Sequence, residues 1–111
     1  MNSKTIRAMT GATATQSLSA SDTALIVVDI QNEYYASNDF RGQMVIPDGE
    51  KVLKSSQKLV SYAHHIGLPV YFVRHLGPKD SPLFAEGSVY AQFHKDLQPS
   101  DQDTIITKTT P

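Results

Sequence analysis

The chain has 111 residues, which suits one domain that buries about 65% of the surface its unfolded form exposes. Ten Lys and Arg residues against 11 Asp and Glu residues leave a formal net charge of -1. The charged residues are scattered along the chain, so nucleic acid and membranes are disfavoured as partners. The sequence has no cysteine, which excludes disulfides, zinc-thiolate sites and thiol nucleophiles within these residues.

Residues 1–22 differ in composition from the rest of the chain. They are rich in Ser, Thr and Ala and contain no acidic residue before Asp22. A transit peptide has a similar composition, but we interpret the segment as a flexible leader or an expression remnant, because it buries too little apolar area to offset its ordering entropy. A secretory signal needs an apolar central region that is absent here, and we expect a cytoplasmic protein.

A strand and a helix open the folded part, which we place at residues 23–111. Residues 25–30 are short, β-branched and apolar on both faces, which predicts a central strand of a parallel sheet covered by helices. Apolar residues then recur at helical spacing over residues 52–66, which predicts an amphipathic helix. We expect Asp48 to cap its start and Gly67 to mark its end.

Two further strands follow, separated by a long loop. Residues 70–73 form a second apolar strand that ends at Arg74 and His75. Residues 76–88 contain two Gly and two Pro residues and predict a surface loop of the kind that carries function. A short helix is possible at residues 89–97, and residues 104–107 are a third strand. The order of elements predicts the opening of an α/β fold with a parallel sheet.

Three polar side chains follow the ends of the three predicted strands. These are Asp29, His75 and Lys108. In open parallel sheets, ligands bind beyond the carboxyl ends of the strands, so residues distant in sequence meet there. Taken singly, each has an ordinary explanation, since Asp often caps or turns the chain and a terminal Lys is usually solvated. Together they predict a site.

Three blocks of sequence resemble the isochorismatase-like cysteine hydrolases. They read ALIVVDIQNEYY, HHIGLPVYFVRH and SPLFAEGSVYAQFHKDLQPSDQDTIITK, and they cover residues 24–111. The family typically shows D-x-Q-N after an apolar strand, then G-x-P-V-x-x-V-R-H, then L-x-P-x-x-x-D-x-x-I-x-K. The resemblance implies a three-layer α/β/α sandwich around a parallel sheet, Rossmann-like, of which this chain holds only the first part.

The resemblance also implies roles for particular residues. Asp29 matches the acidic residue that takes the proton from a cysteine thiol, and Lys108 matches the lysine that favours the thiolate. A thiol reacts slowly when protonated, so a base and a positive charge are needed to supply thiolate near neutral pH. The thiolate would attack a small amide or a related substrate. The candidates to shape or line the substrate pocket are Gln31, Tyr35, His75 and Phe84.

The sequence departs from the family because it contains no cysteine. Either the chain is a fragment, or it is naturally short and has lost thiol catalysis. In both cases we expect it to be inert alone as a cysteine hydrolase and marginally stable. The expected partners are a small-molecule substrate and either a second copy of the chain or a complementing C-terminal segment.

No cofactor and no metal are expected. The nicotinamidase branch of the family binds a metal through an Asp and two His, but His75 lacks a D-x-H companion. His64 and His65 are adjacent in the predicted helix and therefore point to different faces.

Other protein classes fit less well. A receiver domain needs a second acidic residue beside the first and an Asp after its third strand, and neither is present. A haloacid-dehalogenase-type phosphatase needs D-x-D, where this chain has Gln31. Dinucleotide binding stays open, although G-x-G-x-x-G is absent. The main alternative to a hydrolase is an inactive family member or fragment used for binding or assembly.

Overall fold

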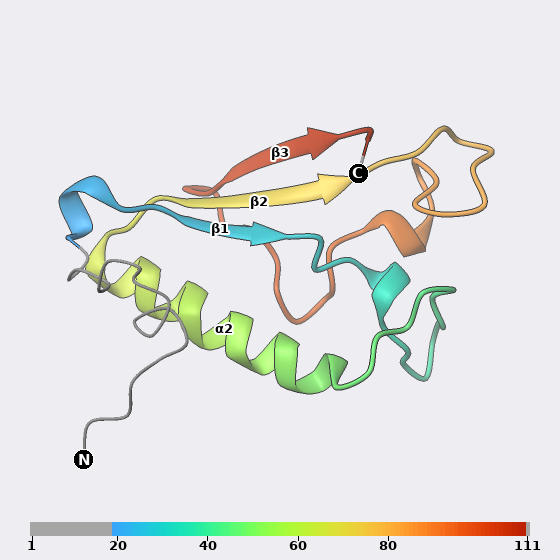
Figure 1. Cartoon of the computed structure of the whole chain (residues 1–111), viewed down its shortest axis with the longest axis horizontal. Coiled ribbons are helices and arrows are strands. Elements are labelled where there is room, and N and C mark those ends of the chain that lie inside the picture. Colours follow the sequence, from blue (N-terminus) through green and yellow to red (C-terminus); the bar gives the residue numbers. More distant parts are fainter. Residues whose placement is uncertain (1–18, 111) are drawn as a thin grey trace, which may run out of the picture.

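The computed structural model describes residues 19–110 (Figure 1). Most of the predicted leader, residues 1–18, therefore lies outside the described residues. The last residues of the leader include a short 3-10 turn at Ala20–Asp22. The rest of the chain alternates strands with helical elements. In order, these are η1 (Ala20–Asp22), β1 (Leu25–Val28), η2 (Asn32–Tyr34), α2 (Gly49–Ile66), β2 (Val70–His75), η3 (Val89–Ala91) and β3 (Thr104–Lys108).

The three strands form one parallel sheet in the order β1-β2-β3. Val27 of β1 pairs with Phe72 of β2, which pairs with Ile105 of β3. The parallel arrangement agrees with the sequence prediction, but β1 lies at an edge of the described sheet and β2 is central. All three strands therefore end on the same side of the molecule, where Asp29, His75 and Lys108 are expected to meet.

Helix α2 covers one face of the sheet (Figure 1). Its inward residues, Leu53, Val60 and Ala63, are buried in the core with Val27 and Phe72. Because the side chains of a strand alternate between faces, the neighbours of Val27 face the other way. That face carries no helix in the part of the chain that the structure describes, so one helical layer of the expected sandwich is present.

The ends of α2 differ in how they are capped. Gly67 adopts a φ of 79°, and its N–H reaches the carbonyls of Ala63 and His64, as expected for a left-handed C-cap. Asp48 occupies the N-cap position, but its side chain makes no capping hydrogen bond. Its φ of 57° is left-handed, whereas side-chain capping uses an extended backbone. The Asp48 carbonyl instead accepts the N–H groups of Lys51 and Val52.

The prediction of a helix at residues 89–97 was wrong, because only the 3-10 turn η3 forms there. Side chains from the segment after β1 donate hydrogen bonds to the backbone carbonyls that a longer helix would use. The Asn32 amide donates to the Val89 carbonyl at 2.8 Å, and the Gln31 amide donates to the Ala91 carbonyl at 2.7 Å. The following residues instead form an isolated bridge between Phe93 and Gln31 and a turn at residues 94–97, and Phe93 and Leu97 are buried in the core.

Candidate active site

Asp29 follows directly after β1 in an unusual backbone conformation. Its φ is 60°, in the left-handed region that only Gly, Asn and Asp visit with any frequency. Its N–H still donates to the Val73 carbonyl at 2.9 Å, so the residue stays attached to the sheet. Backbone strain of this kind costs of order 1 kcal/mol and often accompanies functional sites.

Lys108 is the last residue of β3 and pairs in register with His75. Its Nζ lies 3.3 Å from Oδ2 of Asp29, although the two residues stand near opposite ends of the chain. Oδ1 of Asp29 is buried, and among residues 19–110 no donor bonds to it. Within the described part of the chain, one ammonium group thus holds the carboxylate, and the other carboxylate oxygen lacks a hydrogen-bond donor.

A cavity of about 560 Å³ opens at this ion pair. Its volume falls within the range of sites that hold small molecules. Asp29, Lys108 and His75 line the end formed by the sheet, and Tyr34 and Met44 contribute from the segment between β1 and α2. The remaining wall comes from residues 81–84, in the loop that the sequence marked as functional.

Aromatic rings form the apolar part of this wall. Phe84 lies edge-on to His75 with ring centroids 5.0 Å apart, and it lies 5.4 Å from the ring of Tyr34. Burial raises the pKa of Tyr34, and the nearby carboxylates of Asp29 and Glu33 raise it further, so the phenol stays protonated. The cavity therefore pairs one charged end with an uncharged aromatic wall.

Glu33 fixes the loops that carry this wall. Its side chain is 1% exposed, and its two carboxylate oxygens accept the N–H groups of Phe84 at 3.1 Å and Gln43 at 3.0 Å. Phe84 has a φ of 52°, so this hydrogen bond helps to hold a left-handed residue in place. Glu33 was absent from our sequence prediction, because an acidic residue after a strand usually indicates an exposed turn.

Gln31 and Tyr35, two of the predicted pocket residues, do not line the cavity. Gln31 is fully buried and hydrogen-bonds with the backbone of His75 in both directions, its amide donating to the carbonyl at 2.8 Å and its oxygen accepting the N–H at 2.9 Å. Tyr35 is buried against His94, with ring centroids 4.9 Å apart. The 3-10 turn η2 sends consecutive side chains in different directions, so Tyr34 takes the place predicted for Tyr35. The structure brings together the other four candidates, which are Asp29, His75, Phe84 and Lys108.

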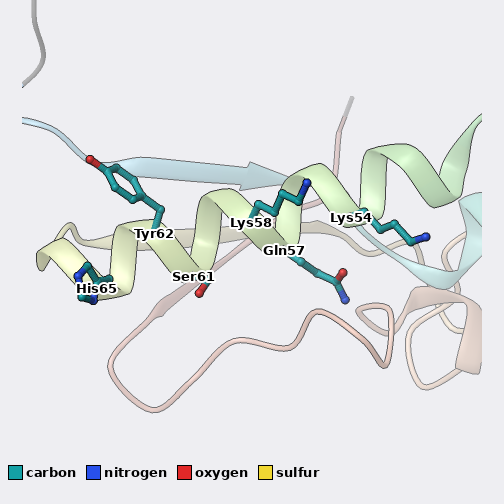
Figure 2. Close-up of a pocket in the computed structure, with 6 residues that line it drawn as sticks. All are labelled: Lys54, Gln57, Lys58, Ser61, Tyr62 and His65. Carbon is teal, nitrogen blue, oxygen red and sulfur yellow. The ribbon is translucent and has the colours of Figure 1, made fainter.

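A second hollow, of about 600 Å³, runs along α2 (Figure 2). It pairs no acidic residue with its cations, so the cavity at Asp29 is the better candidate for catalysis. Within residues 19–110, no three potential ligands gather into a metal cluster, and no helix is long and apolar enough to cross a membrane. The hollow is lined by Lys54, Gln57, Lys58, Ser61, Tyr62 and His65.

Comparisons with known proteins agree with this architecture. The isochorismatase domain model matches residues 23–111. The uncharacterized isochorismatase family protein YddQ of Bacillus subtilis (strain 168) is 31% identical over 90 residues, which make up 80% of this chain and 48% of that protein.

Two solved structures share the fold. An isochorismatase from Pseudomonas putida KT2440 superposes with a TM-score of 0.77 at 25% identity, covering 97% of this chain and 52% of that chain. N-carbamoylsarcosine amidase from Thermoplasma acidophilum superposes with a TM-score of 0.64 at 25% identity, covering 77% of this chain and 50% of that chain. The chain spans about half the length of these proteins. Its parallel α/β fold and the family match place it in the isochorismatase family, as a chain without cysteine that matches only part of the family fold.

Proposed function

We propose that this chain is the N-terminal part of a hydrolase that acts on a small amide or a related substrate. Asp29 and Lys108 would form two members of a catalytic triad, and the cysteine would come from polypeptide outside this chain. One observation carries the proposal: Lys108 Nζ lies 3.3 Å from Asp29 Oδ2 at a cavity, while Oδ1 is buried without a partner among residues 19–110. A free acceptor oxygen is what a base needs to receive a proton.

The proposed chemistry gives each group one task. Asp29 accepts the S–H proton, and the Lys108 ammonium stabilises the thiolate that remains. The thiolate attacks the carbonyl carbon and forms the C–S bond of a tetrahedral intermediate, which then collapses as the C–N bond breaks. The proton held by Asp29 passes to the leaving amine. Water then hydrolyses the thioester, which returns the free thiol and releases the acid.

The amide class rests on similarity and on the shape of the site. One structural neighbour, of 25% identity, is an N-carbamoylsarcosine amidase, which is named for an amide-type substrate. The cavity holds a charged pair at one end and the rings of Phe84 and Tyr34 along the wall. This suits a small molecule with one polar reacting group. The cytoplasmic location expected from the sequence stays a prediction.

The test uses the protein isolated from its source cells with whatever polypeptide completes it, and it begins with the intact mass. A panel of small amides then reports turnover. We expect Asp29→Asn and Lys108→Ala each to lower kcat/KM by about 100-fold or more, because each removes a group that acts on the proton or the thiolate. Matched substitutions of exposed residues, Asp39→Asn and Lys95→Ala, should leave it unchanged.

A second readout separates a chemical role from a structural one. The rate at which iodoacetamide alkylates the cysteine should lose its low-pH plateau in the Lys108→Ala protein, because the thiolate loses its neighbouring cation. Unchanged turnover in both variants would remove the proposed roles. The absence of turnover in every preparation would favour the alternative, an inactive member used for binding or assembly, which the lack of cysteine supports.

A further inference from the structure

The connection between β2 and β3 leaves part of the sheet without a helical cover. Neighbouring parallel strands are usually joined through an α-helix that packs on the sheet. Residues 76–103 make this connection here, and their only helical element is the 3-10 turn η3. Helix α2 packs against β1 and β2, and the irregular segment at residues 92–101 lies beside β3 on the same side of the sheet (Figure 1).

A hollow of about 520 Å³ lies between this segment and the sheet. Its floor includes Ile105 of β3, which pairs in register with Phe72 of β2 and is 48% exposed. Two contacts hold the wall in place. Phe93 packs edge-on against Phe72 with ring centroids 5.6 Å apart, and the Gln98 amide donates to the Phe93 carbonyl at 3.0 Å. The hollow therefore has an apolar part whose position is fixed.

Arg74 brings a guanidinium group to this hollow. It lies two residues after Phe72 and therefore on the same face of β2. Its Nε donates to Oγ1 of Thr107 at 2.9 Å, which orients the side chain. Among residues 19–110, no carboxylate forms an ion pair with Arg74, and its two terminal nitrogens make no hydrogen bond. The free terminal nitrogens form the planar fork that binds a carboxylate through two parallel hydrogen bonds.

The other charged groups near the hollow favour a ligand with a single negative charge. Asp101 also lines the hollow and is exposed. Asp103 follows closely, but its two carboxylate oxygens already accept hydrogen bonds from His64 and Ser100. One guanidinium group beside the Asp101 carboxylate attracts a monoanion, whereas the second charge of a phosphate dianion would meet a repulsion that no further cation offsets.

We propose that this hollow is a binding site for a small carboxylic acid that carries an apolar group. The carboxylate accepts hydrogen bonds from the terminal nitrogens of Arg74, and the apolar group lies on Ile105 and Pro99. The side chain of Gln92, which also lines the hollow and makes no hydrogen bond within the described part of the chain, offers a further donor. The site does not rest on the proposed function.

The hollow is distinct from the cavity at Asp29, although the two are close. Arg74 pairs in register with Thr107, and the next pair along the same strands is His75 with Lys108. Successive side chains of a strand point to opposite faces, and no residue lines both the hollow and the cavity. Because Lys108 is also a cation, the test must separate binding at Arg74 from binding at Lys108.

The test uses the full chain, with benzoate as the probe and saturation-transfer NMR to detect its binding. We expect benzoate to bind, and benzyl alcohol, a neutral molecule of similar size, to bind at least about 10-fold more weakly. An equal concentration of inorganic phosphate should not displace benzoate. Arg74→Gln should weaken benzoate binding at least about 10-fold, because it removes the charge and the fork. Thr107→Val keeps the shape but not the acceptor that orients Arg74, and a loss of about 3-fold is expected.

Two control variants locate the bound acid. Arg41→Gln changes an exposed arginine elsewhere and should leave benzoate binding unchanged, as should Lys108→Ala. Binding that Lys108→Ala abolishes and Arg74→Gln retains would place the acid in the cavity at Asp29 and overturn the proposal. Absence of binding, or equal binding of benzyl alcohol, would overturn it as well, and these two results need no variant. Displacement by phosphate would contradict the assignment to a carboxylate. Circular dichroism shows that Arg74→Gln retains the fold.

Discussion

The carboxylates of Glu33 and Asp29 differ in how completely they are buried and hydrogen-bonded. Glu33 is 1% exposed, and backbone amides from two loops satisfy both of its oxygens. The Asp29 side chain is 21% exposed, sits on a left-handed residue, and has one oxygen facing Lys108 and the other without a donor among residues 19–110. The comparison indicates different roles for the two carboxylates. Glu33, with both oxygens hydrogen-bonded, fixes the loops around the cavity, whereas Asp29, with one oxygen that lacks a donor among residues 19–110, suits the proposed role as a base.

The largest expected effect comes from removing the acid that builds the wall. Glu33→Ala leaves the buried N–H group of Phe84 and the partly buried N–H group of Gln43 without acceptors, which should lower the free energy of unfolding by about 3 kcal/mol. Urea unfolding followed by circular dichroism measures it. Glu33→Gln keeps the volume and one acceptor oxygen, so about half of that loss is expected. A change below about 0.5 kcal/mol in Glu33→Ala would erase the distinction between the two acids.

A third carboxylate, that of Asp103, should make the stability of the fold depend on pH. Burial alone would raise the pKa of Asp103, but hydrogen bonds from Ser100 and His64 outweigh it and lower the pKa below its ordinary value of 3.8. The unfolded chain therefore binds the proton more readily than the folded one. The stabilisation is present above pH 3.8 and is lost as the pH falls through the lower pKa of the folded state.

Removing this carboxylate should show the same pH dependence. Asp103→Ala is expected to lower the free energy of unfolding by about 2 kcal/mol at neutral pH, and by less in acid. Unfolding curves at several pH values measure both. An equal loss at every pH would mean that the hydrogen bonds to Ser100 and His64 do not depend on the charge of Asp103.

The smallest expected effect belongs to the pair at the site. Asp29→Asn, Lys108→Met and the double variant form a cycle whose coupling energy should be about 0.5 to 1 kcal/mol, because both side chains are partly exposed and screened. Asparagine tolerates the left-handed backbone as aspartate does, so the fold is retained. A coupling above about 3 kcal/mol would make this pair a structural element and weaken its assignment to catalysis.

Much of this arrangement follows from periodicity and topology. The apolar runs locate the three strands, and parallel strands must end on one side, so Asp29, His75 and Lys108 could be brought together before any coordinates were known. What escaped prediction depends on side chains bonding to the backbone of distant segments. The Asn32 side chain donates to the Val89 carbonyl, where only one turn of the predicted helix forms, and the Glu33 carboxylate accepts the N–H group of Phe84 and so positions that residue at the cavity. No local pattern in the sequence records such contacts.

The double hydrogen bond between Gln31 and the backbone of His75 has a mechanical consequence. Because the same amide also donates to the Ala91 carbonyl, Gln31 links the end of β2 to η3. A ligand that displaced His75 would therefore also displace η3 through these hydrogen bonds. We therefore expect the occupancy of the cavity to be transmitted to η3 through the Gln31 side chain rather than along the polypeptide.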